Sequence, residues 1–197
     1  MAGLTVAEVA AAIRAGGVAI VPTDTVYGLA AAPDAAAEIF ELKKRPASKA
    51  LPVLGTGPAQ LRAVAQLDEV ALALAEKAWP GPLTLVVPRA GGFTADLGGS
   101  DTSTIAVRVP AHPLALELLA LSGPLAVTSA NRSGDPPATT AHAARALFPD
   151  AVLLDGGTCD GSPSTVVSIT GEAQVLREGE LPGADVLGWV RDLRTGS

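Results

Sequence analysis

The sequence predicts an α/β fold, a single domain in which a twisted, mixed β-sheet is packed with helices. Short apolar runs, typical of buried strands, alternate along the chain with segments of helical periodicity. Near the C-terminal end, three strand candidates follow one another too closely for helical crossovers, so some pairing must be antiparallel. The chain has 197 residues, of which 48% are hydrophobic, and shows neither an internal repeat nor a long Gly/Ser linker. We therefore expect one domain over residues 1–197.

The first elements follow from capping signals and apolar runs. Thr5 and Glu8 have the spacing of a capping box, so a helix should begin after Thr5. Four apolar residues that end at Pro22 are typical of a buried strand, and Asp34 is expected to cap a second helix. The predicted order is a helix over 6–15, a strand over 18–21, a polar loop over 23–28 and the helix after Asp34.

The same alternation continues to the C-terminus. The predicted strands are 51–54, 83–87, 105–109, 125–128, 152–154, 165–169 and 174–176. The predicted helices are 68–78, 113–121, 141–147 and 184–193.

Composition excludes several classes of protein. One cysteine, Cys159, and two separated histidines, His112 and His142, cannot form a disulfide framework or a recognisable metal site, and they fit a reducing cytoplasm. The sequence has neither a signal peptide nor an apolar stretch of transmembrane length, so we expect a soluble, cytoplasmic protein without a membrane partner. The net charge of -6 and the aromatic content of 3% argue against nucleic acid as the principal ligand.

Two polar segments could bind a small anion, but each also has an ordinary structural explanation. The loop 22–28 offers hydroxyls and N–H groups, yet a turn in which Asp24 and the threonines satisfy their own backbone fits equally well. Lys43 and Arg45, at the end of the second helix, could grip a triphosphate. A solvated cationic helix end that stops at Pro46 is the simpler interpretation.

Two further segments leave the same choice open. Strand alternation places Arg108 on the face opposite Val107, where it is either exposed to solvent or holds a carboxylate or phosphate. Ser129 and Asn131, in the segment 128–134, could donate to phosphate or to a base, or could form a turn. The sequence has no Walker-type or G-x-G-x-x-G loop and no serine with a nearby histidine. Spacing alone therefore indicates an anion-binding α/β domain.

Seven short motifs occur in one order along nearly the whole chain. They are P-T-D-T-V-Y-G at 22–28, K-x-R-P at 43–46, W-P-G-P-L-T at 79–84, A-V-R-V-P-x-H-P at 106–113, T-S-A-N-x-S-G at 128–134, S-T-V-V at 164–167 and L-R-E-G at 176–179. Together they resemble the YrdC-like threonylcarbamoyl-AMP synthase family, in its short, single-domain form. One such motif would be weak evidence, but the ordered set is very specific.

The resemblance implies an enzyme, a nucleotidyltransferase that joins L-threonine, bicarbonate and ATP for the modification of tRNA. Threonine's amine would capture bicarbonate as a carbamate, whose oxygen attacks the α-phosphorus of ATP and expels pyrophosphate. Mg²⁺ is expected to bind mainly through the nucleotide, without a dedicated metal site in the protein. Downstream tRNA threonylcarbamoyl-transferase proteins would receive the product, and a weak contact with tRNA itself stays open.

The resemblance also implies site residues by position, with Lys43 and Arg45 as catalytic residues. The implied ATP-binding residues are Lys43, Arg45, Thr104, Ser129, Asn131 and Arg177, and the implied threonine-binding residues are Thr23, Arg108 and Ser164. Thr25 and Ser133 are nearby candidates of lower rank. The chain departs from many members after K-x-R-P, where it reads Lys49-Ala50-Leu51-Pro52 in place of N-P-L or K-P-L.

Two alternative functions are weighed against this one. A concave basic face could bind double-stranded RNA or tRNA without chemistry, but the acidic charge and the few aromatic residues count against it. A similar domain occurs in hydrogenase-maturation carbamoyltransferases, which use carbamoyl phosphate. Those proteins carry acylphosphatase-like and zinc-finger parts, for which this chain has neither the length nor the cysteines.

Overall fold

The strands form one sheet in which parallel and antiparallel pairs are mixed. The computed structural model describes residues 3–132 and 134–196. Within these ranges nine strands pair in the order β7-β1-β2-β6-β3-β5-β4-β8-β9. The pairs β1/β7, β3/β5 and β4/β8 are parallel and the other neighbours are antiparallel. The predicted α/β class with a mixed sheet is confirmed.

Most predicted elements are present within a few residues of their expected bounds. The strands are β1 (Ala19–Val21), β2 (Gly28–Ala31), β3 (Val53–Leu54), β4 (Leu83–Pro88), β5 (Thr104–Arg108), β6 (Leu125–Ser129), β7 (Val152–Leu153), β8 (Thr165–Ser168) and β9 (Gln174–Arg177). The helices are α1 (Val6–Arg14), the 3₁₀ helix η1 (Pro33–Ala35), α2 (Ala36–Lys43), α3 (Pro58–Leu61), α4 (Glu69–Ala78), α5 (Pro113–Ser122), α6 (Ala141–Leu147) and α7 (Gly183–Thr195). The capping box of Thr5 and Glu8 is confirmed at the start of α1.

Two features of the segment after β1 differ from the sequence prediction. Residues 28–31, for which the sequence predicts no strand, form β2, because they pair with β1 on one side and β6 on the other. Their Gly-Leu-Ala-Ala sequence lacks the β-branched residues that usually mark a strand. The prediction that Asp34 caps α2 was wrong. Asp34 lies inside η1, since Pro33 starts a helical turn earlier, and Ala35 precedes α2 without a side-chain cap.

Alternate side chains of the first strands enter two different apolar clusters. Ala19 and Val21 join α1 and α5 in one cluster, whereas Ile20 joins a larger cluster on the opposite face of the sheet. Burying a large aliphatic side chain contributes about 1.5–3 kcal/mol, so both faces need helical cover here. Leu54 and Val127 in the first cluster also line the pocket described below. The pocket therefore adjoins an apolar cluster on that face.

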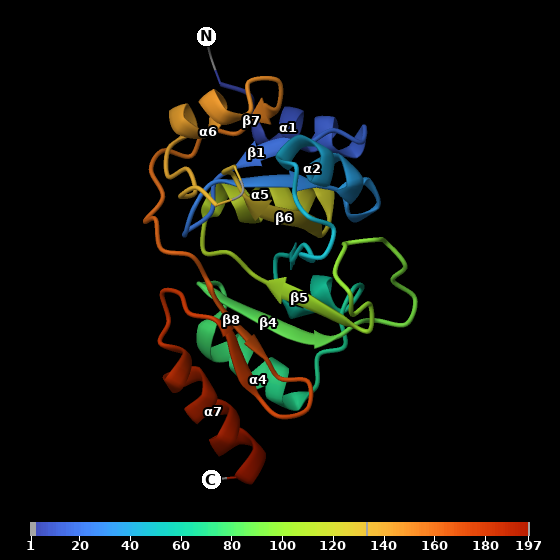
Figure 1. The fold of residues 1–197 in the computed structure, drawn as a ribbon, viewed down its shortest axis with the longest axis vertical. Helices are drawn as coiled ribbons and strands as arrows, with labels where there is room; N and C mark the ends of the chain where they lie inside the picture. The colour runs from blue at the N-terminus through green and yellow to red at the C-terminus, as the bar shows by residue number, and fades with distance from the viewer. Residues whose placement is uncertain (1–2, 133, 197) are drawn as a thin grey trace.

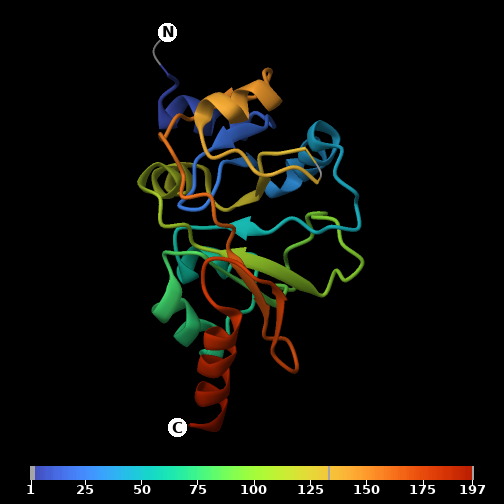
Figure 2. The same ribbon diagram turned by 60° about the vertical axis from the view of Figure 1, so that its left-hand side comes forward.

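The sheet divides visibly into an upper and a lower part (Figures 1 and 2). The upper part carries α1, α2, α5 and α6, and the lower part carries α4 and α7. The strands β7 and β8 follow each other in the sequence but lie far apart in the sheet order, and residues 154–164 run between them along one side of the molecule. The end of this crossover lines the pocket described below.

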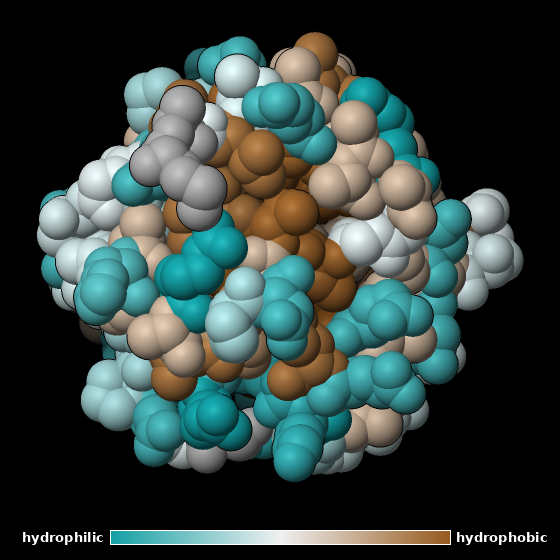
Figure 3. Space-filling view, turned by 90° about the horizontal axis from the view of Figure 1, so that it is seen from above, coloured by the Kyte–Doolittle hydropathy of each residue, from teal (hydrophilic) through white to brown (hydrophobic). Residues whose placement is uncertain are grey.

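The end of the molecule that carries α1 and α6 shows hydrophobic residues in a central band framed by hydrophilic ones (Figure 3). Among the residues that the structure describes, the exposed large hydrophobic residues are Leu4, Leu42, Leu121 and Leu176. Within the same residues, no helix combines the length and the apolar character that spanning a bilayer requires.

Candidate active site

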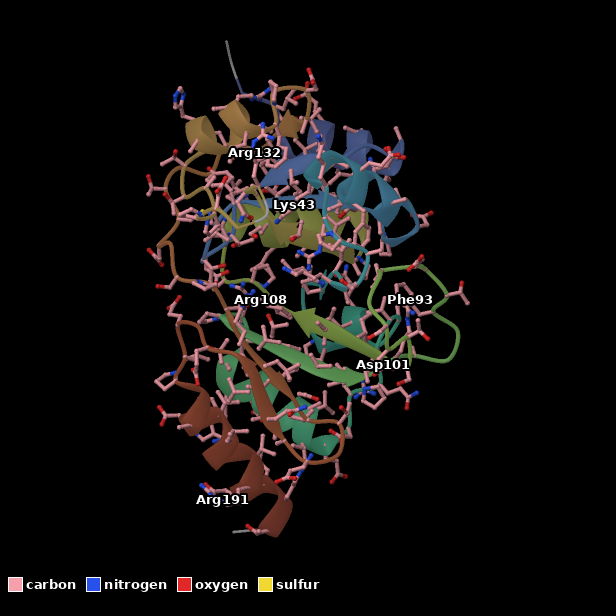
Figure 4. All side chains as sticks on the ribbon, viewed as in Figure 1. Lys43, Phe93, Asp101, Arg108, Arg132 and Arg191 are labelled. Carbon is pink, nitrogen blue, oxygen red and sulfur yellow. The ribbon has the colours of Figure 1, made fainter. Side chains whose placement is uncertain are left out.

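One pocket of about 420 Å³ lies beside the sheet and brings most of the predicted residues together. The segments that wall it are far apart in sequence: the loop after β1, the turn after α2, the strands β3, β4, β5 and β6, and the ends of the β7–β8 crossover and β9. Its polar lining residues are Thr23, Thr25, Arg45, Thr84, Arg108, Thr128, Ser129, Ser164 and Arg177. Figure 4 shows Lys43 within the upper part of the molecule and Arg108 below it, between the upper and lower parts.

Lys43 is the last residue of α2 and is buried, with 6% of its surface exposed. Its Nζ atom lies 2.5 Å from the Ser129 carbonyl oxygen, 2.9 Å from Asn131 Oδ1 and 3.1 Å from Thr128 Oγ1. These acceptors take the three N–H groups of an ammonium. Burial, reinforced by the nearby charges of Arg45 and Lys49, lowers the pKa of Lys43 from 10.5 to about 8. The interpretation of a solvated helix end is therefore wrong for Lys43.

Arg45 is held by the turn that follows α2. Its Nε and Nη2 atoms donate to the carbonyl oxygens of Lys49 (2.9 Å) and Ala50 (3.0 Å), and Nη1 donates to Thr128 Oγ1 (3.3 Å). The residues at which this chain departs from many members of the resembled family thus supply backbone acceptors for Arg45. Burial and the charge of Arg177 lower the pKa of Arg45.

Arg108 ends β5 with only 5% of its surface exposed, so the interpretation of a solvent-exposed arginine is wrong. Its Nε donates to the Gly81 carbonyl oxygen (2.9 Å), Nη1 donates to Thr25 Oγ1 (3.1 Å) and Nη2 pairs with Asp24 Oδ1 (2.7 Å). Burial lowers the pKa of Arg108, and the charge of Asp24 opposes that effect.

Arg177, at the end of β9, contacts Ser164. Its Nε and Nη2 atoms donate to the Ser164 carbonyl oxygen at 3.1 and 2.7 Å, and Nη2 also donates to Ser164 Oγ at 3.0 Å. The Ser164 hydroxyl shares a further hydrogen bond of 2.8 Å with that of Thr84. Burial and the charge of Arg108 lower the pKa of Arg177.

Each of the three arginines keeps two N–H groups without a partner among the described residues. A guanidinium has five N–H donors, and three are used in each case. Asp24–Arg108 is the one ion pair between described residues. The pocket therefore has an excess of positive charge and unused donors that suit carboxylates and phosphates.

The threonines of the loop 22–28 act partly as turn formers, as the alternative interpretation predicts. The Thr23 hydroxyl donates to the Val26 carbonyl oxygen (2.6 Å) and accepts from the backbone N–H groups of Thr25 and Val26 (3.2 and 3.1 Å). Asp24 and Thr25 instead face Arg108. The loop thus combines a self-supporting turn with polar groups for the pocket.

The comparisons with known proteins agree on one family. The sequence model of the Sua5/YciO/YrdC family, described as "Telomere recombination", matches residues 11–179. The chain belongs to the Sua5/YciO/YrdC family. Its relatives include the threonylcarbamoyl-AMP synthases of Pyrococcus abyssi (41% identical over 92% of this chain and 56% of that protein) and Chromohalobacter salexigens (41% over 82% of this chain and 90% of that protein).

A solved structure in the Sua5/YciO/YrdC family superposes well on this chain. It is P. abyssi Sua5 in complex with L-threonine, with a TM-score of 0.87 and 39% identity, covering 93% of this chain. This chain spans only 56% of that protein's length. The identity is high enough to support the family as well as the fold.

Not every residue expected from the Sua5/YciO/YrdC resemblance lines the pocket. Lys43 and Asn131 lie behind Ser129, and Asn131 Oδ1 accepts from the Ser129 hydroxyl at 2.6 Å. Thr104 shares a face of β5 with Arg108 but lies outside the lining, and its hydroxyl donates to Asp101 at 2.9 Å. Ser133 lies outside the described residues.

Sequence reasoning assigned no site role to three residues of this Sua5/YciO/YrdC site. Thr128 accepts from both Lys43 and Arg45, Thr84 bonds Ser164, and Asp24 pairs with Arg108. All three lie inside motifs that carry the resemblance, so the motifs were the available signal. Nothing in their spacing indicates which cation each one meets.

Proposed function

We propose that this chain is an L-threonylcarbamoyladenylate synthase, a nucleotidyltransferase that forms threonylcarbamoyl-AMP and pyrophosphate from L-threonine, bicarbonate and ATP. The observation that carries the proposal is the lining of one pocket by Arg45, Arg108 and Arg177, each with unused N–H donors. The proposed substrates bring a carboxylate and a triphosphate together, and these are the anions that guanidinium forks bind. The names of the relatives support the same activity.

The proposed chemistry proceeds in two steps. The amine nitrogen of threonine attacks the carbon of bicarbonate, a C–N bond forms and water leaves, which gives a carbamate. A carbamate oxygen then attacks the α-phosphorus of ATP, and the bond from that phosphorus to the pyrophosphate oxygen breaks. No enzyme nucleophile takes part, so the protein contributes positioning and neutralisation of charge.

Arg108 would hold the carboxylate of threonine with its two unused N–H groups. Thr23 and Ser164 line the same pocket and would contact the other polar groups of the amino acid. The Ser164 hydroxyl, which bonds Thr84 and Arg177, keeps capacity for one more hydrogen bond. The Thr23 hydroxyl already donates to Val26 and accepts from two backbone N–H groups, so a bond to substrate would replace one of these.

Arg45 and Arg177 would bind the phosphates of ATP. Lys43 would add positive charge from behind Ser129 and Asn131, because its own N–H groups are used within the protein. Thr104, on the pocket face of β5, would contact a nucleotide that extends along that strand. These assignments keep Lys43 and Arg45 as the proposed catalytic pair.

Mg²⁺ would accompany ATP in this proposal. No Asp or Glu lines the pocket, and the described residues contain no cluster of three or more His, Cys, Asp or Glu side chains arranged for a metal. These residues do not fit a protein-held Mg²⁺ site, so its oxygen ligands would come from the phosphates and water. We assign it no step of its own.

The product would pass to a separate tRNA threonylcarbamoyl-transferase. A mixed anhydride of a carbamate and AMP is reactive towards water and amines, so the consuming reaction must be a group transfer to an acceptor. This handover and the cytoplasmic location of the reaction are parts of the proposal.

We expect this chain to release pyrophosphate from MgATP and bicarbonate only when L-threonine is present. The assay couples pyrophosphate detection to mass detection of threonylcarbamoyl-AMP in the same sample. Carbamoyl phosphate in place of threonine and bicarbonate is the control for the alternative carbamoyl chemistry. Release that does not depend on threonine, or that carbamoyl phosphate supports better, would contradict the proposal.

A further inference from the structure

The guanidinium of Arg108 is fixed from three sides before any substrate arrives. Nε, Nη1 and Nη2 each donate one hydrogen bond, to Gly81, Thr25 and Asp24 respectively. Asp24 is the only charged acceptor of the three, and its distance of 2.7 Å is the shortest. Two N–H groups, one on each Nη atom, are left for a ligand.

The backbone segments that carry Asp24 and Gly81 are held by contacts other than those with Arg108. The Thr23 hydroxyl fixes the turn that carries Asp24 through its bonds to Val26. Gly81 is fixed by its own N–H bond to the Val109 carbonyl oxygen (2.9 Å) and by close packing, since a Cβ there would lie 2.5 Å from the Ala78 carbonyl oxygen. Arg108 therefore meets a preformed set of acceptors that determines its orientation.

Asp24 does not itself reach the substrate space. Arg108 is among the residues that line the pocket, whereas Asp24 is not, and the Asp24 side chain is only 14% exposed. An unpaired buried guanidinium would be unfavourable in this wall, because a desolvated charge needs a partner. Asp24 thus supplies charge and direction from behind Arg108.

We propose that Asp24 is a positioning residue, which orients the two unused N–H groups of the Arg108 guanidinium towards the α-carboxylate of the amino-acid substrate. Asp24 thereby determines selectivity for an amino acid whose carboxylate is free. This inference rests on the proposed function, because it takes the amino acid as the ligand of Arg108. A purely structural Asp24 would change the amount of folded protein without changing which substrate is preferred.

The test compares L-threonine with L-threoninamide, which lacks the carboxylate charge, in pyrophosphate release by the wild type and Asp24→Asn. Asparagine keeps the shape and one acceptor oxygen but removes the charge. We expect the KM for threonine to rise about tenfold or more, with the KM for ATP nearly unchanged, because bonds to charged groups are the stronger ones. The preference for threonine over threoninamide should fall by a similar factor.

The effects of Asp24→Asn and Arg108→Ala should not add. If Asp24 acts through Arg108, the double variant will have the threonine KM of Arg108→Ala alone. Asp34→Asn, the same chemical change at an exposed aspartate, is the matched control and should leave all constants unchanged. Additive effects, or equal increases in the KM values for threonine and ATP, would overturn the proposal.

If Asp24→Asn does not fold, Thr25→Val is a second test of how Arg108 is oriented, because it removes a neutral acceptor from the same guanidinium. A raised threonine KM is expected there, and an unchanged one would overturn the orientation argument. Failure of the proposed function is distinguishable, since the wild type would then show no threonine-dependent release at all.

Discussion

The ammonium of Lys43 titrates close to physiological pH, because burial and the cations Arg45 and Lys49 lower its pKa to about 8. Below pH 8 the group is charged in the folded protein, and above it the charge is lost. We predict that ATP affinity falls as the pH rises from 7 to 9, by about tenfold, the equivalent of one pKa unit or about 1.4 kcal/mol. Calorimetric titration of ATP at several pH values measures this.

Lys43→Met should bind ATP weakly and without this pH dependence. Lys77→Met, at an exposed lysine far along the sequence, should behave like the wild type. A fall in ATP affinity that persists unchanged in Lys43→Met would assign the titration to another group.

At the level of single residues, the motifs predicted most of the side chains that meet in the pocket, but not the environment of each one. Lys43 follows a helical pattern that suggests solvent, yet its Nζ atom reaches a segment 85 or more residues away. The sequence was equally compatible with an exposed and a buried Arg108. Strand alternation shows on which face of the sheet a side chain lies, but not which elements cover that face. Such facts depend on tertiary contacts that local spacing does not contain.

Among the elements, the loop between β4 and β5 supports the turn that holds Arg45. Gly99 donates its N–H to the Ala47 carbonyl oxygen at 2.7 Å, has a φ of +89° and would place a Cβ 2.9 Å from Ala50 Cβ. We predict that Gly99→Ala displaces the Ala50 carbonyl and raises the KM for ATP several-fold. The unfavourable backbone should also lower stability by about 1–2 kcal/mol, measured by thermal unfolding.

Gly123→Ala is the matched control for Gly99→Ala. Gly123 has a φ of +83° but nothing within 4 Å of the added Cβ, so it carries the backbone strain without the crowding. Both variants should lose stability, and only Gly99→Ala should lose ATP affinity. Equal KM values for ATP in the two variants would refute a role for this loop in positioning Arg45.

Elements with strong local signals were predicted well. The capping box of Thr5 and Glu8 places α1 correctly, because capping is a local interaction. The helix predicted over 68–78 matches α4 to within one residue. The strand β2 was missed since its existence depends on β1 and β6, which pair with it on both sides. The early start of the helical turn at Pro33 displaced the expected cap at Asp34.

At the scale of the whole molecule, the order of strands is what creates the site. The strands β7 and β8 are neighbours in sequence, but β1, β2, β6, β3, β5 and β4 lie between them in the sheet. The crossover that joins them brings Ser164 to Arg177 and to the pocket. Spacing predicted a mixed sheet but not this order, because many pairings satisfy the same apolar pattern. The resemblance to a known family, and not the spacing of residues, predicted which residues belong to one site.

Charge is distributed so that cations gather in the pocket of an acidic protein. The chain has a formal net charge of -6, whereas Arg45, Arg108 and Arg177 line one cavity of about 420 Å³. Arg108 has only 5% of its surface exposed, so it is poorly accessible to the phosphate backbone of a nucleic acid. Such an arrangement attracts a small anion and repels a polyanion at longer range.

We therefore predict weak binding of tRNA even at low salt. A titration of labelled tRNA from about 50 to 200 mM salt should show no tight complex, because RNA-binding modules need many phosphate contacts and lose affinity steeply over that range. Arg45→Ala separates two sources of any residual binding, since it should weaken ATP binding but leave a contact outside the pocket unchanged. The contradicting outcome is tight, salt-sensitive binding of tRNA that ATP displaces and that Arg45→Ala abolishes. It would mean that the pocket binds RNA, and the synthase proposal would lose its main support.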